Sequence, residues 1–268
     1  MWQTCEKHVT DARERLEKEE KGQKLNTAYY NIVDEWLHSD LPEFEKSDRR
    51  LGLEALGLIG AAIETTAWTL SLMTFYIYND REIMRKLRAE LLSEAPDKEL
   101  PPLAKLEALP YFSALVTEAF RVAGGPISRL PRIYPNDPTV LRSIFDGKPV
   151  EYVVPPGTVL SMSSTYIHNN PELFPDPLIF KPERWLDENG KRKRDMEKYL
   201  LHFSKGTRGC VGLNLATAEL YMCLAALVLK VGENIDLYET DLRDVTPEFD
   251  NFAMRPYKDS QGIRVVIK

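Results

Sequence analysis

Two amphipathic patterns occupy residues 1–39, ahead of a break at residues 39–42 that ends in Pro42. In the first pattern, apolar residues recur every three or four positions among charged ones: Trp2, Cys5, Val9, Ala12 and Leu16. The second pattern has the same spacing: Tyr29, Ile32, Val33, Trp36 and Leu37. This spacing places apolar side chains on one face of a helix. We therefore expect two helices in the first 45 residues.

A long helix is predicted next, over residues 46–78. Its most apolar stretch, Leu51 to Leu72, has the length of a membrane span but contains Glu54 and Glu64. An acidic side chain near the centre of a bilayer costs about 2.5–3.5 kcal/mol. We therefore interpret the stretch as a long buried helix in a soluble core.

Shorter elements follow, separated by helix-breaking residues. Asp80 can cap a helix over residues 81–93. Four prolines between residues 96 and 110 indicate a loop, and a further helix spans 111–123 before Gly124-Gly125-Pro126 ends it. A last long helix is predicted near residues 213–229.

Short runs rich in β-branched residues indicate strands at 127–134, 150–154, 159–162 and 263–267. The charged run at 188–195 is most simply a solvated loop. The fold class is therefore mainly α with small β-sheets (α+β). There is no internal repeat and no boundary that would separate a second domain, so residues 1–268 form one domain.

Composition narrows the function classes. The 268 residues carry a formal charge of −6, which argues against nucleic-acid binding. Three cysteines at unrelated positions do not form a disulfide framework. No apolar run follows the charges near Met1, so we expect neither a signal peptide nor an anchor, and a soluble intracellular chain.

Cys210 lies in the segment Phe203-Ser204-Lys205-Gly206-Thr207-Arg208-Gly209-Cys210-Val211-Gly212. The glycines allow a sharp turn and close approach of a bulky partner. Two nearby cations and the start of the following helix favour a thiolate. A single thiolate at a helix N-terminus suits an axial bond to haem iron.

Three other roles for Cys210 agree less well with its surroundings. Most free cysteines are small buried hydrophobic residues, but the glycines and Arg208 argue against that here. A zinc site needs three or four close ligands, and Cys223 would lie roughly 20 Å along the helix. A cysteine nucleophile needs a positioned histidine, and His202 faces another part of a tight turn.

The spacing Phe-x-x-Gly-x-Arg-x-Cys-x-Gly resembles the haem-binding loop of the cytochrome P450 family at every fixed position. The resemblance implies haem b as cofactor, with Cys210 as the axial iron ligand. The loop residues that it implies beside the haem are Phe203, Gly206, Arg208 and Gly212.

Glu118 and Arg121 share a helix face at a spacing of three residues. Such a pair is by default a surface ion pair worth less than about 1 kcal/mol. Apolar neighbours suggest burial, and Pro182-Glu183-Arg184-Trp185 offers Arg184 as a third member. Together they resemble the family's structural Glu-Arg-Arg triad, which supports the loop behind the haem.

The run Ala61-Ala62-Ile63-Glu64-Thr65-Thr66 places an acid and two hydroxyls in an apolar helix. One explanation is a core helix whose threonines bond back to the preceding turn. The run also resembles the family's oxygen-activation motif, with Ala62 where glycine is usual. That resemblance implies that Thr65 positions dioxygen and its protons and that Glu64 relays protons. The alanine would narrow the space for dioxygen.

Arg129 and Arg132 flank the strand predicted at 127–134 and could be simple surface charges. In the family, an arginine in this strand binds a haem propionate, as does the one two residues before the cysteine, here Arg208. The guanidinium fork matches a carboxylate. Arg129 is preferred, with Arg132 as the alternative.

The resemblance covers nearly the whole chain but only the C-terminal part of the family. It divides residues 1–268 into helices before the central helix (1–45), the central helix (46–78), the Glu-x-x-Arg helix (111–123), and the haem loop with the final helix (203–229). In style the chain is similar to fungal microsomal members, which implies a relative at the endoplasmic reticulum membrane.

The implied activity is oxygen insertion into a small apolar organic substrate, in fungal secondary metabolism, with dioxygen as co-substrate. Electrons would come from an NADPH-dependent flavoprotein reductase that docks on Lys198, Lys205 and Arg208. The alternative is a truncated, inactive fragment without a stable haem site.

Overall fold

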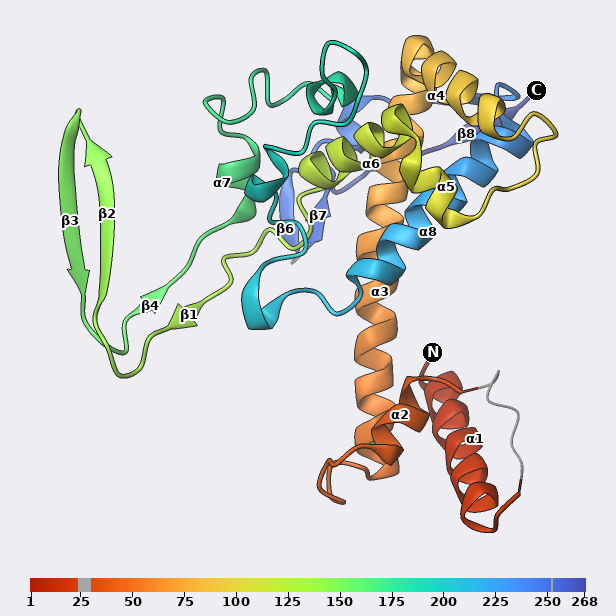
Figure 1. Ribbon diagram of the computed structural model, residues 1–268, viewed down its shortest axis with the longest axis vertical. Coiled ribbons are helices and arrows are strands. Elements are labelled where there is room, and N and C mark those ends of the chain that lie inside the picture. The colour runs from red at the N-terminus through yellow and green to blue at the C-terminus, as the bar shows by residue number, and fades with distance from the viewer. Residues whose placement is uncertain (24–29, 252) are drawn as a thin grey trace. The chain divides into compact units, whose positions relative to one another are not determined.

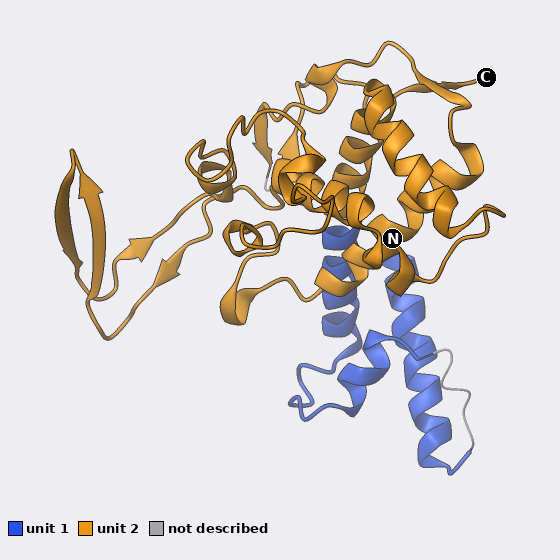
Figure 2. Ribbon diagram, turned by 45° about the horizontal axis from the view of Figure 1, so that its top comes forward, with its two compact units in different colours: residues 1–64 blue, residues 65–268 orange. Residues whose placement is uncertain are grey.

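The computed structural model describes residues 1–23, 30–251 and 253–268. The chain divides into two compact units, residues 1–64 and 65–268 (Figure 2). Tyr29, which was predicted on the second helix, lies outside the described residues.

The described residues of the first unit form two helices and the beginning of a third. They are α1 (Trp2–Glu20), α2 (Ile32–His38) and the first part of α3 (Asp48–Asn79) (Figure 1). Both helices predicted in the first 45 residues are confirmed. Their packed apolar side chains are Val9, Ala12, Val33, Leu37 and Leu51. Asn31 caps α2, and Arg15 on α1 donates two hydrogen bonds of 2.8 Å to the Asp34 carboxylate on α2.

Helix α3 agrees with the predicted range but not with the predicted burial. Leu51 belongs to the core of the first unit, and Leu72 and Met73 to the core of the second. Between them, Leu53 is 45% and Ile63 is 51% exposed. The expectation of a helix buried from Leu51 to Leu72 is therefore wrong for its middle. A helix is buried only where other elements pack on it, and this middle segment belongs to neither core.

Within the described residues, two helices are long and apolar enough to cross a membrane, judged by length and composition. They are α3 and the helix at Leu213–Val231, with mean hydropathies of 1.3 and 1.5. Core helices of soluble proteins meet the same criterion, so this does not assign either helix to a membrane.

The second unit is built on helices that share one core. Besides the end of α3, they are α4 (Arg81–Glu94), α5 (Leu103–Ala108), α6 (Pro110–Ala123) and α8 (Leu213–Ala226), which continues as a π-helical turn, η5 (Leu227–Val231). The Asp80 side chain accepts from the first turn of α4, which confirms the predicted cap. Helix α5 corrects the loop predicted from the prolines: Pro102 stands at its N-cap, and Leu106 is buried in the core.

The strands in the described ranges form four two-stranded antiparallel sheets. Strand β1 (Arg132–Ile133) pairs with β4 (Val159–Leu160), and β2 (Thr139–Phe145) pairs with β3 (Lys148–Val154) over seven residues (Figure 1). Further pairs are β5 (Ile235–Leu237) with β8 (Val265–Ile267), and β6 (Phe249–Asn251) with β7 (Ala253–Arg255). The turn between β2 and β3 holds Asp146 and Gly147, both at positive φ, a dipeptide that favours tight hairpins.

Short helices complete the second unit: α7 (Ser164–His168), η2 (Pro182–Trp185), η3 (Glu197–Tyr199), η4 (Gly206–Arg208) and η6 (Leu242–Asp244). The charged run at 188–195 is not wholly solvated, since the Arg192 side chain is only 13% exposed. Mainly helical structure with small sheets confirms the predicted fold class.

Candidate functional site

The most buried charge in the second unit is Glu118, in the middle of α6. Its side chain is fully buried and accepts five hydrogen bonds. Arg121 donates through Nε (2.9 Å) and Nη2 (2.8 Å), and Arg184 through Nε (3.0 Å). The Trp185 indole Nε1 (2.9 Å) and the Lys181 amide (2.9 Å) supply the other two. The structure thus brings the three side chains of the predicted triad into one network.

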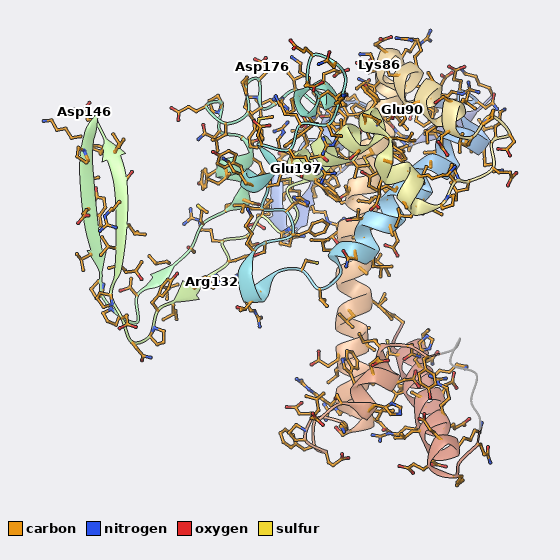
Figure 3. The ribbon with its side chains drawn as sticks, in the orientation of Figure 1. Lys86, Glu90, Arg132, Asp146, Asp176 and Glu197 are labelled. Carbon is orange, nitrogen blue, oxygen red and sulfur yellow. The ribbon has the colours of Figure 1, made fainter. Side chains whose placement is uncertain are left out.

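The remaining donors of the two arginines hold the chain that precedes η2. Nη1 of Arg121 donates to the carbonyls of His168 (2.9 Å) and Pro177 (2.8 Å). Nη1 of Arg184 donates to the carbonyl of Pro175 (2.7 Å). Burying two cations against one carboxylate is costly unless such partners also satisfy the remaining N–H donors. Asp176, within this stretch, is labelled in Figure 3.

Two histidines connect this network to the cysteine segment. His168 is 1% exposed, and its Nε2 accepts the amide N–H of Leu201 (2.9 Å). Burial, aided by the Arg121 charge, lowers the pKa of His168 to about 4, so the ring is neutral near pH 7. His202 stacks on Phe120 of α6 at 4.3 Å between ring centroids, and burial lowers its pKa to about 3.

Sequence reasoning did not find Trp185, Lys181 or His168 as members of this arrangement. A Trp next to Arg184 offered one signal, because a buried indole N–H needs an acceptor. The sequence contains no such signal for the amide of Lys181 or the ring of His168, since their roles depend on contacts between distant segments.

The cysteine segment contacts α6 through Phe203, whose ring lies 5.0 Å from that of Phe120, edge to face. The Cys210 amide donates to the carbonyl of Phe203 (2.8 Å), which closes the loop around η4. Gly125 shows how tightly the chain passes here. It has a φ of +64°, and a Cβ at this position would lie 2.2 Å from the His202 carbonyl oxygen.

The features around Cys210 fit a large flat apolar group. Cys210 is exposed, and α8 begins three residues later, at Leu213. Val211 is 85% and Leu215 is 58% exposed beside it. A Cβ on Gly206 would meet nothing within 4 Å. An exposed thiol at a helix start, flanked by uncovered apolar side chains, has the donor chemistry and the open face that haem needs.

The predicted propionate ligands lie on the surface. Arg129, Arg132 and Arg208 are exposed, and Nη1 of Arg132 donates to the carbonyl of Pro131 (2.9 Å) (Figure 3). Gly212 is the N-cap of α8. In the described part of the chain, no group of three or more His, Cys, Asp or Glu side chains could hold a metal ion. Axial binding of haem iron by a single thiolate does not require such a group of side chains.

Glu64 and Thr65 are consecutive residues of α3, at the boundary between the two units. Glu64 is exposed and Thr65 is half-buried. The carbonyl of Thr65 accepts a hydrogen bond from the hydroxyl of Thr69 (3.0 Å), and the Thr74 hydroxyl donates to the Leu70 carbonyl. Bonding back to the preceding turn therefore occurs on this helix, at Thr69 and Thr74.

Comparison with known proteins gives these features a context. The family model of cytochrome P450 matches residues 1–257. The cytochrome P450 monooxygenase sdnE of Sordaria araneosa is 40% identical over 247 residues, covering 91% of this chain and 46% of the relative. The cytochrome P450 monooxygenase oblB of Emericella variicolor is 37% identical, over 98% of this chain and 47% of the relative.

A third relative is the fusicoccadiene C-8 hydroxylase of Phomopsis amygdali, which is 34% identical over 97% of this chain and 48% of its own length. The chain thus spans about half the length of the curated relatives it matches. Because the family model matches nearly all of it and the relatives agree, this chain belongs to the cytochrome P450 family.

Proposed function

We propose that the chain carries the thiolate loop and the proton-delivery residues of a haem-thiolate monooxygenase. Such an enzyme inserts one oxygen atom into a small apolar organic substrate. The observation that carries the proposal is the exposed Cys210 in a loop held against α6. When bound through a cysteine thiolate, haem supplies the activation of dioxygen, and the thiolate favours O–O cleavage.

Several residues of the chain would each have a separate role in holding the haem. Cys210 binds the iron, and the Phe203 carbonyl orients the cysteine by accepting its amide N–H. Arg208, with Arg129 or Arg132, would hold the haem carboxylates, for which a guanidinium fork is suited. The network around Glu118 makes the segment behind the loop rigid, because its five donors come from α6 and from residues 181–185.

On α3, Thr65 would hold a proton at its hydroxyl and Glu64 would pass protons from solvent. The exposure of Glu64 supports this division, since a relay must reach water. Ala62 precedes them by two residues and would narrow the space where the family usually has glycine.

The proposed substrate class draws on the names of the relatives, and the proposed setting draws on the resemblance to fungal microsomal members. One is named a hydroxylase of fusicoccadiene, and others are fungal monooxygenases. We propose an apolar organic substrate, oxidised in fungal secondary metabolism at the endoplasmic reticulum membrane.

An NADPH-dependent flavoprotein reductase is the proposed electron donor. Lys198, Lys205 and Arg208 are exposed on the cysteine side and would attract its acidic surface. Reversing the charge of Lys198 or Lys205 should slow reduction by the reductase at low salt. Reversal of the distant Lys148, at the start of β3, should not. Equal effects at both places would contradict the docking assignment.

The test of the haem site is a spectrum. The chain is produced with haem precursor, reduced and exposed to carbon monoxide, and the red-shifted band of a thiolate-bound carbonyl complex is expected. Cys210→Ala should abolish the band. Cys223→Ala, which removes another exposed cysteine, should retain it.

Two results would count against the proposal. A band that survives Cys210→Ala would show that the ligand assignment is wrong. Failure of the unmodified chain to retain haem on a column would favour the alternative, an inert polypeptide without a stable haem site.

A further inference from the structure

A pocket of about 380 Å³ opens in the second unit between α6, residues 192–205 and the first turns of α8. Its volume falls within the range of roughly 300–1,000 Å³ that is usual for small-molecule sites. Three cations line it, Arg192, Arg194 and Lys205, against a single carboxylate, that of Glu197. Figure 3 labels Glu197.

The carboxylate of Glu197 is already engaged. Nη2 of Arg192 donates to it at 2.5 Å and to the Thr117 hydroxyl at 2.8 Å. Burial lowers the pKa of Arg192, and the charge of Arg194 lowers it further, while Glu197 opposes both effects. The pocket therefore has an excess of positive charge.

Two buried polar atoms on its lining residues have no partner among the described residues. They are Nε of Arg192 and Nδ1 of His202. Eight side-chain atoms in the described part of the chain share this condition, and two of the eight belong to this one pocket. The Nε–H of Arg192 is a donor, and buried donors are normally satisfied, so Arg192 indicates a place for an acceptor.

The remaining lining mixes apolar side chains with hydroxyl groups. Val116 and Phe120 on α6 and the ring of Phe203 contribute to one wall. A ligand that suits both halves has an anionic head and a flat apolar body. We infer that this pocket binds a small organic carboxylate, with its head toward Arg192 and Arg194 and its body against Phe120 and Phe203.

Occupancy would act on the cysteine loop. Phe203 lines the pocket, and its carbonyl accepts the Cys210 amide at 2.8 Å. Fixing the Phe203 ring therefore restrains the backbone of Cys210. Lys205 also lines the pocket, so a bound anion would occupy one of the cations proposed for docking of the reductase. The site itself requires no haem.

The test uses the 268-residue chain without added haem and 2-naphthoate as the probe. Calorimetric titration should show saturable binding. The uncharged 2-naphthylmethanol should bind at least about ten-fold more weakly, as expected when a charge-assisted hydrogen bond is lost. Bound 2-naphthoate should slow hydrogen exchange in residues 203–210 and leave the β2–β3 hairpin unchanged.

The matched variants are Arg194→Gln and Lys191→Gln, which remove exposed cations from the same loop. Arg194→Gln should weaken 2-naphthoate by about three-fold or more, whereas Lys191, which does not line the pocket, should be neutral. Circular dichroism of each variant is the check that it is folded. Equal losses in both variants, equal binding of the alcohol, or no saturable binding would each overturn the inference.

Discussion

The indole Nε1 of Trp185 donates a 2.9 Å hydrogen bond to Oε2 of Glu118, from 67 residues further along the chain. Both side chains are fully buried. The bond therefore joins η2 to the middle of α6 at a point where water cannot replace it.

Trp185→Phe keeps an aromatic ring but removes this donor. Because the acceptor is a buried carboxylate, the free energy of unfolding should fall by about 1.5–3 kcal/mol. Urea titration measures the change. Trp36→Phe, in the first unit, is the control and should cost less. Equal losses would show that ring size, not the N–H, determines the effect.

Glu118→Gln should lower the free energy of unfolding more than Trp185→Phe does. It leaves the buried guanidinium groups of Arg121 and Arg184 without their shared anion, and breaking such a buried pair typically costs about 3–5 kcal/mol. Glu151→Gln, which disrupts the exposed pair with Arg142, should cost no more than about 1 kcal/mol. If the urea unfolding transitions of the two variants had comparable midpoints, the network around Glu118 would have no stabilising role.

Acid should destabilise the fold through His168. Its folded-state pKa is about 4 against an ordinary value of 6.5, so the unfolded chain binds more protons between these values. Stability is therefore lost as the pH falls from about 6.5 to about 4. From this ring we expect a loss of about 2 kcal/mol between pH 7 and pH 5.

His168→Gln removes this titration and should reduce the loss measured by urea unfolding at the two pH values. His8→Gln, at an exposed histidine, is the control and should retain the full loss. An unchanged pH dependence in His168→Gln would mean that other groups cause the acid sensitivity.

Thr65→Ala tests the proposed proton delivery and depends on the proposed function. Electrons from NADPH should still be consumed, but hydroxylated product should fall by about ten-fold or more as hydrogen peroxide is released instead. Thr74→Ala removes a hydroxyl on the same helix that bonds to the Leu70 carbonyl, and should leave the product yield unchanged. A product yield that is unaffected by Thr65→Ala would remove Thr65 from the mechanism.

Local sequence patterns were sufficient to predict most of the helices. Asp80 before Arg81 and Gly124 after Ala123 marked the ends of α4 and α6, because capping and helix termination depend on neighbouring residues. Strand β2 was missed even though Asp146-Gly147 indicated a hairpin. The strands at 235–237, 249–251 and 253–255 were also missed, since three-residue strands have too few positions to show a pattern.

By itself, the sequence determined the helices, the glycine-framed Cys210 segment and the residues that could form an ionic triad. These depend on spacing and on residue chemistry over a few positions. Only the tertiary structure decided that Glu118 has five donors, that His168 holds the Leu201 amide and that Arg192 turns inward. It also decided that the middle of α3 is exposed rather than buried. Burial and hydrogen-bond partners arise from segments that are distant in the chain, and no local pattern records which distant segment will pack on which.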